Sequence, residues 1–229
     1  MIELLKQNRE LFDIFARQEE YNSPLLDMHQ RFHSSLSRNR NVLVPEVSKF
    51  LVENGLKPEY PEDKKFAVCL THDIDFVAFS RSEVIRQLIS RQPQNALKMF
   101  LYNKNAKWNP RCNFGDIMTL EEKYGAKSSF YFMALDNESF DFNYKIEDLF
   151  PELGIIGDKG WEVGLHGGYE AYDDLNKIRI EKKRLERVLG KKVSGYRNHY
   201  LRFKIPDTWE LLNKAGFKYD TTLGYPDCV

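Results

Sequence analysis

The sequence predicts an α/β fold built on a parallel sheet, of (β/α) barrel type but incomplete or open, preceded by a helical N-terminal extension. Three observations predict it. Apolar, β-prone runs alternate with helical segments over most of the chain, which is the pattern of successive β-α units. Polar, titratable residues follow the runs directly, where α/β proteins collect their chemistry. Only five such runs occur, too few to close a (β/α) barrel comfortably.

The first strand is predicted over Phe66–Leu70, a nearly continuous apolar run. A run of this length is typical of a strand buried on both faces. It leads into Thr71–Asp75, which holds one Thr, one His and two Asp. Asp73 and Asp75 are two residues apart, so in extended chain their side chains point to the same side. Two carboxylates held this close repel each other unless a cation, a proton or a basic partner separates them.

Residues 1–60 are predicted to form the helical extension, and residues 61–229 the barrel domain. Apolar residues recur at roughly helical spacing over residues 1–20, with charged residues between them. A second helix is predicted over Val44–Asn54, because Gly55 and then a proline follow it. The extension should therefore pack its apolar faces on the main domain.

The barrel domain continues as alternating helices and strands, with glycine or proline at most boundaries. The predicted elements are helices over Ser82–Ser90 and Asn95–Tyr102 with Pro93 breaking between them, a loop over Lys107–Asn113, a helix over Asp116–Tyr124, a strand over Ser128–Met133, an acidic and turn-rich segment over 135–160, a strand over Trp161–Gly168, a charged helix over Leu175–Leu189, a strand over Val193–Tyr200, a helix over Asp207–Ala215 and a strand over Phe217–Leu223.

Bulk composition excludes several classes of function. Lys plus Arg number 34 and Asp plus Glu number 34, so nothing global indicates a nucleic-acid partner or an anionic membrane. No stretch approaches the ~18 apolar residues of a membrane span, and the N-terminus lacks the pattern of a signal peptide. The three widely spaced cysteines form neither a disulfide framework nor a metal knuckle. We therefore expect a cytoplasmic protein.

Two kinds of histidine are present. His29 and His33 have helical i, i+4 spacing, which can suit a metal, but a metal pair needs further ligands, so exposed histidines are the expected outcome. His166 and His199 instead follow predicted strands, as Asp75 does. Carboxylate plus imidazole, with room left for water, is the ligand set of a catalytic zinc or a similar divalent ion.

The remaining charged residues at the strand ends complete this candidate site. Of the two carboxylates, Asp73 and Asp75, the one that does not bind the ion can act as general base. Arg197 would keep that carboxylate ionised and in place. Charged residues at three successive strand ends arise by chance far more rarely than a charged residue at a single strand end.

The sequence resembles the polysaccharide deacetylase family, also called the NodB-homology or carbohydrate esterase 4 group, over roughly residues 64–229. The similar segments are Thr71–Asp75 for the first motif, Leu165–Glu170 for the second, Gly195–Tyr200 for the third and Tyr219–Gly224 for the fourth. The stretch His199–Phe203, followed by Thr208–Trp209 and Tyr219–Asp220, resembles a subgroup associated with bacterial surface-polysaccharide biosynthesis. The resemblance implies a barrel of the NodB-homology type.

The resemblance also implies roles. It makes Asp73 the catalytic base and Arg197 the residue that orients this base. It makes Asp75 and His166 ligands to a divalent metal ion, for which zinc is the first candidate. It assigns the backbone N–H near Tyr200 to the oxyanion hole. The implied reaction is removal of an N-acetyl or O-acetyl group from a sugar of a bacterial surface polysaccharide or its precursor.

The sequence departs from the family pattern at the third ligand. The second motif usually ends in a second histidine, and Glu170 stands in its place. Either Glu170 or His199 can complete the ligand set. We prefer His199, because it shares a strand side with Arg197, whereas Glu170 lies beyond a Gly-Gly loop. With His199 as ligand, Trp108, Tyr169 and Glu170 are the predicted substrate-binding residues.

Two further departures concern the general acid. His72 replaces the usual aromatic residue and should face away from its neighbours, as a structural residue or a weak candidate acid. The fifth motif, whose histidine is the usual acid, is absent because the sequence ends at Val229. Either the C-terminal part of the barrel is missing, or His199, His72 or a water must supply the proton. Two alternatives therefore stay open: a catalytically impaired carbohydrate-binding relative, and a metal-dependent amidase on a small non-sugar substrate.

Overall fold

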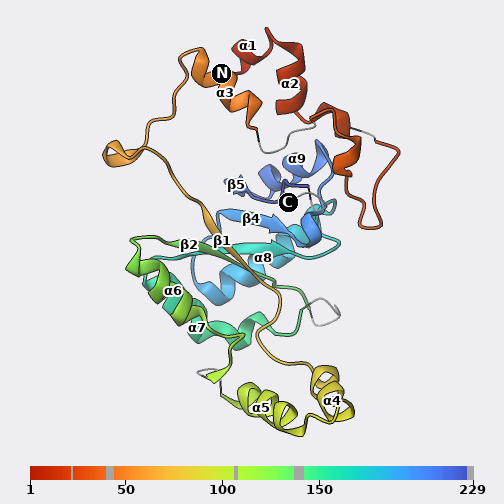
Figure 1. The fold of residues 1–229 in the computed structure, drawn as a ribbon, viewed down its shortest axis with the longest axis vertical. Coiled ribbons are helices and arrows are strands. Elements are labelled where there is room, and N and C mark those ends of the chain that lie inside the picture. Colours follow the sequence, from red (N-terminus) through yellow and green to blue (C-terminus); the bar gives the residue numbers. More distant parts are fainter. Residues whose placement is uncertain (22, 40–43, 106–107, 137–141, 226–229) are drawn as a thin grey trace.

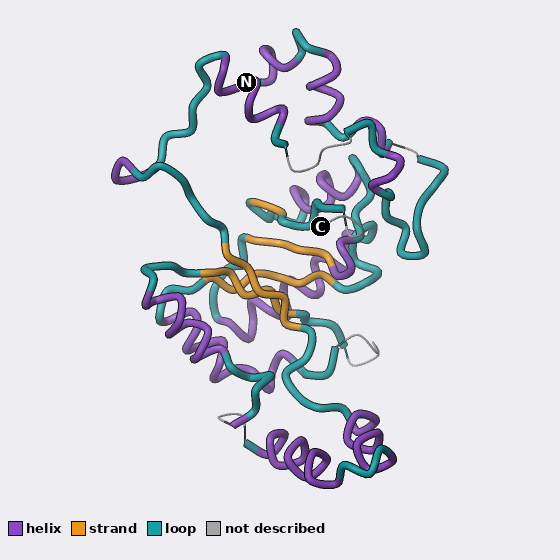
Figure 2. Tube along the Cα trace, viewed as in Figure 1, coloured by secondary structure: helices purple, strands orange, loops and turns teal. Residues whose placement is uncertain are grey.

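The computed structural model describes residues 1–229 except 22, 40–43, 106–107, 137–141 and 226–229. Its centre is one parallel sheet, whose strands lie side by side in Figures 1 and 2. The strands are β1 (Leu70–Ile74), β2 (Ser128–Phe132), β3 (Glu162–Gly167), β4 (Gly195–Asn198) and β5 (Tyr219–Asp220). They follow one another across the sheet in sequence order, so the winding never reverses. This is the winding of a (β/α) barrel and not of a dinucleotide-binding fold.

The sheet is curled and open. In a flat sheet, three strand spacings would separate the ends of β1 and β4 by about 14 Å. Yet Asp75, which follows β1, and His199, which follows β4, approach to 3.7 Å between Oδ1 and Nδ1. In the part of the chain that the structure describes, β1 and β5 do not pair, so the barrel stays open between them. The predicted open α/β barrel is confirmed.

The α-helices surround the sheet and form two appendages. They are α1 (Ile2–Leu5), α2 (Arg9–Phe15), α3 (Glu46–Glu53), α4 (Arg81–Ile89), α5 (Pro93–Lys104), α6 (Phe114–Lys123), α7 (Phe150–Asp158), α8 (Leu175–Leu189) and α9 (Asp207–Lys214). Short 3₁₀ turns are η1 (Gln18–Glu20), η2 (Ser34–Leu36), η3 (Pro61–Asp63), η5 (Ile146–Leu149) and η6 (His199–Leu201). None of the described helices combines the length and apolar character that a bilayer crossing requires.

Alternation along β2 produces two differently built faces. Phe130 and Phe132 point outward, into the main core with Phe114 of α6. Tyr131 points to the inner face, where its ring lies across Gly164 of β3. A Cβ at Gly164 would come 2.5 Å from that ring, so glycine is required for the two strands to pack. The outer face thus carries the apolar core, and the inner face is left for polar side chains.

The first strand differs from the prediction. β1 begins only at Leu70, and the apolar run before it is exposed: Phe66 and Val68 are 72% and 65% accessible. The prediction of a strand buried on both faces is therefore wrong. The reason is position, since β1 is an edge strand with β2 as its sheet neighbour among the described residues. Local apolarity cannot distinguish an edge from a centre.

Other elements differ in length or number. The helix predicted over residues 1–20 is two short helices and a 3₁₀ turn, and the helix α7 lies inside the segment predicted to be turn-rich. Glycines and acidic residues of that segment weigh against a helix, yet Leu153 and Ile156 are fully buried on one face. The fourth and fifth strands are shorter than predicted. Lys107, the first residue of the predicted loop, and Cys228, one of the three cysteines, lie outside the described residues.

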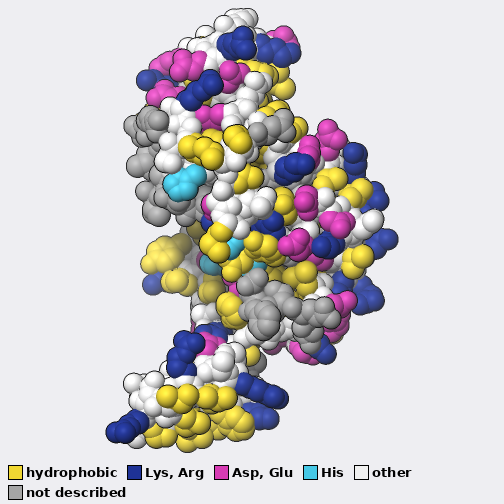
Figure 3. Space-filling model, turned by 90° about the vertical axis from the view of Figure 1, so that its right-hand side faces the viewer, with side chains coloured by type: hydrophobic (Ala, Val, Ile, Leu, Met, Phe, Trp, Pro, Cys, Tyr) yellow, Lys and Arg dark blue, Asp and Glu magenta, His cyan; other side chains and the backbone are white. Residues whose placement is uncertain are grey.

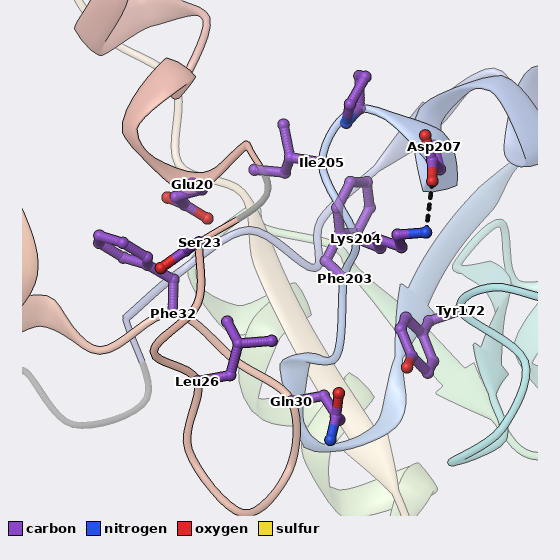
Figure 4. A pocket seen from close by; sticks show the side chains of 11 residues that line it. Glu20, Ser23, Leu26, Gln30, Phe32, Tyr172, Phe203, Lys204, Ile205 and Asp207 are labelled. Atoms are coloured by element: carbon purple, nitrogen blue, oxygen red, sulfur yellow. Dashed lines mark ion pairs between the residues drawn. The ribbon is translucent and has the colours of Figure 1, made fainter.

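The two appendages lie at opposite ends of the molecule (Figure 1). At one end, residues of the extension that include Arg17, Arg31 and Ser37 contact the barrel domain. Figure 4 shows part of this region: Glu20, Leu26 and Phe32 face Phe203 and Ile205 across a depression of about 150 Å³. At the other end, α4 and α5 form a projecting hairpin that follows directly from the end of β1.

Candidate functional site

Five of the predicted site residues, Asp73, Asp75, His166, His199 and Tyr200, meet at the carboxyl end of the sheet. A depression of about 370 Å³ lies there, where β1, β3 and β4 end. Its lining residues are Arg31, Asp73, Asp75, Phe76, His166, Asn198, His199, Tyr200 and Leu201. Asp75 and His166, which had to converge for a metal site to exist, are 3.3 Å apart between Oδ1 and Nε2.

Three donor atoms have the spacing that a zinc ion demands. His166 Nε2 lies 3.3 Å from Asp75 Oδ1 and 3.2 Å from His199 Nδ1, and the Asp75–His199 separation is 3.7 Å. Tetrahedral ligands at Zn–N and Zn–O distances of 2.0–2.2 Å are about 3.4 Å from one another. The three observed separations lie around that value. Together these residues form a group that can hold a metal ion, which we call the Asp75–His166–His199 triad.

The hydrogen bonding of His166 fixes which atom it offers. Its Nδ1 lies 3.0 Å from the carbonyl oxygen of Arg197, which can only accept, so Nδ1 carries the hydrogen and donates. In the neutral ring Nε2 then presents a lone pair to Asp75. Orientation of a ligating histidine by a carbonyl at its other nitrogen is a usual feature of metal sites.

Asp75 is a buried acceptor in this arrangement. Its Oδ1 is enclosed and, within the described residues, accepts no well-formed hydrogen bond while the two rings are neutral. Burial raises the pKa of Asp75, but a hydrogen bond and positive charge from His166, and the charge of His199, outweigh burial and lower this pKa overall. The carboxylate is therefore stabilised by whatever positive species lies between it and the rings, whether ring protons or a cation. The donor set fits a divalent ion.

Asp73 lies outside the triad and is bound to Arg197. Arg197 Nη1 donates to Asp73 Oδ1 at 2.9 Å. Its Nε donates to Thr221, to the carbonyl oxygen at 3.2 Å and to Oγ1 at 3.0 Å, and its guanidinium lies over the ring of Tyr131. Arg197 is thus held by Thr221, directly after β5, and by Tyr131 of the inner face, while it contacts Asp73 of β1. The predicted contact between Arg197 and Asp73 is present, and Asp73 remains about one-third exposed toward the depression.

Glu170 and His199, the two candidate third ligands, lie in different places. His199 belongs to the triad, whereas Glu170 is about 60% exposed and faces Arg202 at 3.5 Å. Glu170 does not line the depression. The structure therefore brings His199 and not Glu170 to the candidate metal site.

The other predicted residues fall in different places. Tyr169 adjoins the site, with its ring centroid 5.5 Å from that of Tyr200. Trp108 is exposed and lines a different depression, beside the start of α6, so the structure does not bring it to the triad. His72 points to the outer face, where it bonds Glu121 at 2.8 Å and stacks on Phe130. A part for His72 as proton donor is excluded by that direction.

Sequence reasoning missed the residues that the extension contributes. His29 stacks on the ring of Tyr200 with centroids 4.5 Å apart, and its Nδ1 lies 3.1 Å from the hydroxyl of Tyr169. Arg31 Nη1 donates to the carbonyl of Tyr200 at 2.8 Å and is fixed by Asp27 at 2.7 Å. The i, i+4 spacing of Asp27 and Arg31 was the available signal, but nothing in it indicates a partner far along the chain. His29 and His33 do not form the helical pair considered from the sequence, because no helix spans them.

These contacts hold a strained turn at the edge of the site. Tyr200 and Leu201 both have positive φ, 58° and 54°, although neither is glycine. Each such residue costs of order 1–3 kcal/mol unless its surroundings fix it. The bond from Arg31 and the stack of His29 supply that fixation from the extension. The turn follows His199 directly, so its shape also sets where that ligand stands.

Comparisons with known proteins give structural likeness only. Neither a family model nor a curated protein sequence matches the chain. A crystal structure of a candidate polysaccharide deacetylase from Mycobacterium smegmatis is similar with a TM-score of 0.48 and 20% identity, over 72% of this chain and 54% of that one. A mutant of a CE4-family pseudoenzyme with restored enzymatic activity is similar with a TM-score of 0.37 and 16% identity, over 47% of this chain and 39% of that one. The chain thus spans about half or less of these proteins, and likeness at this level carries no argument about activity.

Proposed function

We propose that the protein is a metal-dependent hydrolase that removes an N-acetyl or O-acetyl group from a sugar of a bacterial surface polysaccharide or its precursor. One observation carries the proposal: the Asp75–His166–His199 triad has the donor spacing of a zinc site, beside a carboxylate that is off the triad. The resemblance of the strand-end motifs to polysaccharide deacetylases supports the choice of reaction. A cytoplasmic precursor as substrate, and the division into an extension (1–60) and a barrel domain (61–229), belong to the same proposal.

The triad would hold the ion, with zinc as the first choice because two imidazoles and one carboxylate are ligands that zinc favours. Three protein ligands leave a coordination position open, as catalytic sites require. A divalent ion held there polarises an acyl carbonyl and makes water more acidic. Everything else in the reaction falls to the side chains and backbone of this chain.

Asp73 is the group placed to move the proton. It borders the depression, and Arg197 restricts it to one orientation. In the proposed reaction Asp73 accepts a proton from the attacking water. Because His72 faces the opposite side of the sheet and His199 belongs to the triad, Asp73 is also the group that returns a proton to the leaving amine or alcohol.

The turn after His199 is proposed to stabilise the developing negative charge. Tyr200 and Leu201 line the depression, and the bond from Arg31 fixes the turn before substrate arrives, so the backbone N–H groups of the turn are the proposed donors. Donors fixed in advance stabilise charge in the transition state without a cost of reorganisation. Removing one such donor in other hydrolases costs about 10²–10³ in kcat.

An aromatic wall beside the turn is proposed to receive the sugar. His29, Tyr169 and Tyr200 contact one another, and the ring of Tyr200 is partly exposed. Sugar rings pack their C–H faces on such surfaces, while Glu170, exposed at the rim, can accept hydrogen bonds from hydroxyl groups. Trp108 lies in a separate depression, so its proposed contact with substrate is apart from the site at the triad.

The test is acetate release by the purified protein loaded with Zn²⁺ or Co²⁺, measured on N-acetylated and O-acetylated sugars. Wild type is compared with Asp75→Asn, which removes a metal ligand, and with Asp73→Asn, which should keep the metal and lose turnover. Metal content is measured on each protein. If metal is bound and no substrate releases acetate, the hydrolase proposal fails. Saccharide binding without release would then indicate an impaired relative, and release from small non-sugar amides alone would indicate the amidase.

A further inference from the structure

The projecting hairpin formed by α4 and α5, residues 81–104, differs in charge from the rest of the chain. It carries five basic residues and one acidic residue, whereas the whole chain is balanced at 34 of each sign. The acidic residue, Glu83, is bound by Arg111 at 2.6 Å, from outside the hairpin. The basic residues are all exposed; they are Arg81, Arg86, Arg91, Lys98 and Lys104. The neutral total of the protein thus hides a local positive excess.

The same hairpin exposes large apolar side chains at regular spacing. Six of them are between 48% and 77% accessible: Ile85, Leu88 and Ile89 on α4, and Leu97, Phe100 and Leu101 on α5. In both helices the positions are i, i+3 and i+4, so each helix presents one outward apolar stripe. Figure 3 shows hydrophobic side chains gathered along this lower end of the molecule, with Lys and Arg at the margins.

These stripes do not belong to the core of the described residues. The core cluster contains side chains of the barrel strands and of α6 to α9, but none of the hairpin. The hairpin closes on itself through Ala96, which is buried, and is attached at its base by Asn103, bonded to the backbone of Phe79 at 2.7 and 2.8 Å. Replacing the side chains of these stripes with alanine or serine should therefore leave the folding of the barrel unchanged.

We propose that this hairpin rests on the surface of an anionic lipid bilayer. Interfacial helices combine one face of Leu, Ile and Phe with a polar face rich in Lys and Arg. The stripes would lie at the boundary of headgroups and acyl chains, and the basic side chains at the lipid phosphates. The hairpin is a convex projection (Figure 1), which a flat, deformable surface accepts.

The test is flotation of the full-length protein with vesicles of phosphatidylcholine mixed with phosphatidylglycerol, against vesicles of phosphatidylcholine alone. Binding to the anionic vesicles only, weakening with salt, is expected. The double variant Arg86→Gln/Lys98→Gln should bind about 30-fold more weakly, because each basic side chain near an anionic surface contributes about fivefold. The double variant Ile89→Ser/Phe100→Ser should lose binding at high salt, since it removes the inserted surface.

The matched control is Ile180→Ser/Lys183→Gln on α8, where an apolar and a basic residue are also exposed. It should bind as wild type does, and circular dichroism checks that all variants fold. No binding to anionic vesicles, equal binding to both vesicle types, or equal loss in the control overturns the proposal. A further outcome would also overturn it: the protein binds no vesicles and sediments as a dimer, and Ile89→Ser/Phe100→Ser converts the dimer to a monomer. The apolar stripes would then join two copies of the chain.

Discussion

The identity of the third metal ligand can be tested by the effect of zinc on thermal unfolding. The structure places His199 in the triad and leaves Glu170 exposed, paired with Arg202. His199→Ala should therefore remove most of the zinc-dependent stabilisation, and Glu170→Ala should keep it. Each change removes one of the two candidate third ligands, so each variant is the control for the other.

The expected size follows from linkage. Zinc at 100 times its dissociation constant stabilises the folded protein by about 2.7 kcal/mol. For a chain of 229 residues this corresponds to a rise in Tm of about 5–10 °C. If loss of one of three donors weakens binding about 100-fold, the same zinc concentration stabilises His199→Ala by about 0.4 kcal/mol, or about 1 °C. The difference between the two variants is thus several times the error of a melting experiment.

Differential scanning fluorimetry with and without Zn²⁺ gives these shifts, and titration of Co²⁺ by visible absorption reports the coordination directly. A metal-free sample prepared with chelator is the baseline. The reasoning is refuted if Glu170→Ala loses the zinc shift while His199→Ala keeps it. It is also refuted if wild type binds no divalent ion at all.

Three further predictions concern catalysis, packing and pH. Asp73→Asn should lower acetate release by about 10²–10⁴-fold and leave the zinc-induced rise in Tm unchanged, measured side by side on one preparation. Tyr144→Phe should cost about 2–4 kcal/mol in urea unfolding, because the buried hydroxyl accepts a backbone N–H at 2.8 Å and donates to a carbonyl at 2.6 Å, and both backbone groups would be left unpaired. A hydrogen bond from Arg111 lowers the pKa of Glu83 to about 2 from an ordinary 4.5. Since the folded pKa is the lower one, this stability is present above about pH 4.5 and is lost as the pH falls toward 2. Glu83→Gln should therefore be less stable than wild type by about 1 kcal/mol at pH 7 and equally stable near pH 2, and a pH-independent difference would contradict the assignment.

The candidate site was largely predictable because its signals are local. Asp73, Asp75, His166 and His199 each stand at the end of a β-prone run, and parallel strands bring such ends to one edge. The spacing of two residues between Asp73 and Asp75 also predicted that both face the same side, as they do. Their chemical roles remain predictions.

What the sequence could not supply was long-range. Arg31 bonds a carbonyl 169 positions away, and no local pattern indicates that partner. The exposure of Phe66 depends on β1 lying at the sheet edge, which is a property of the whole sheet order. Helix α7 formed against the preference of its glycines because tertiary burial of Leu153 and Ile156 outweighs intrinsic propensity.

The buried Arg202 shows what a truncated form of this protein would lose. It lies between the rings of Tyr169 and Tyr172, and it donates to the backbone of His29 at 2.9 Å. A guanidinium enclosed in this way ties three separate stretches of chain into one cooperative unit, and residue 29 is one of them. A cut near residue 60 would remove the backbone carbonyl that the buried Arg202 guanidinium binds, and would release the turn at the edge of the candidate site from Arg31. A fragment that begins near residue 60 would therefore lack contacts that reach from the extension into the barrel domain.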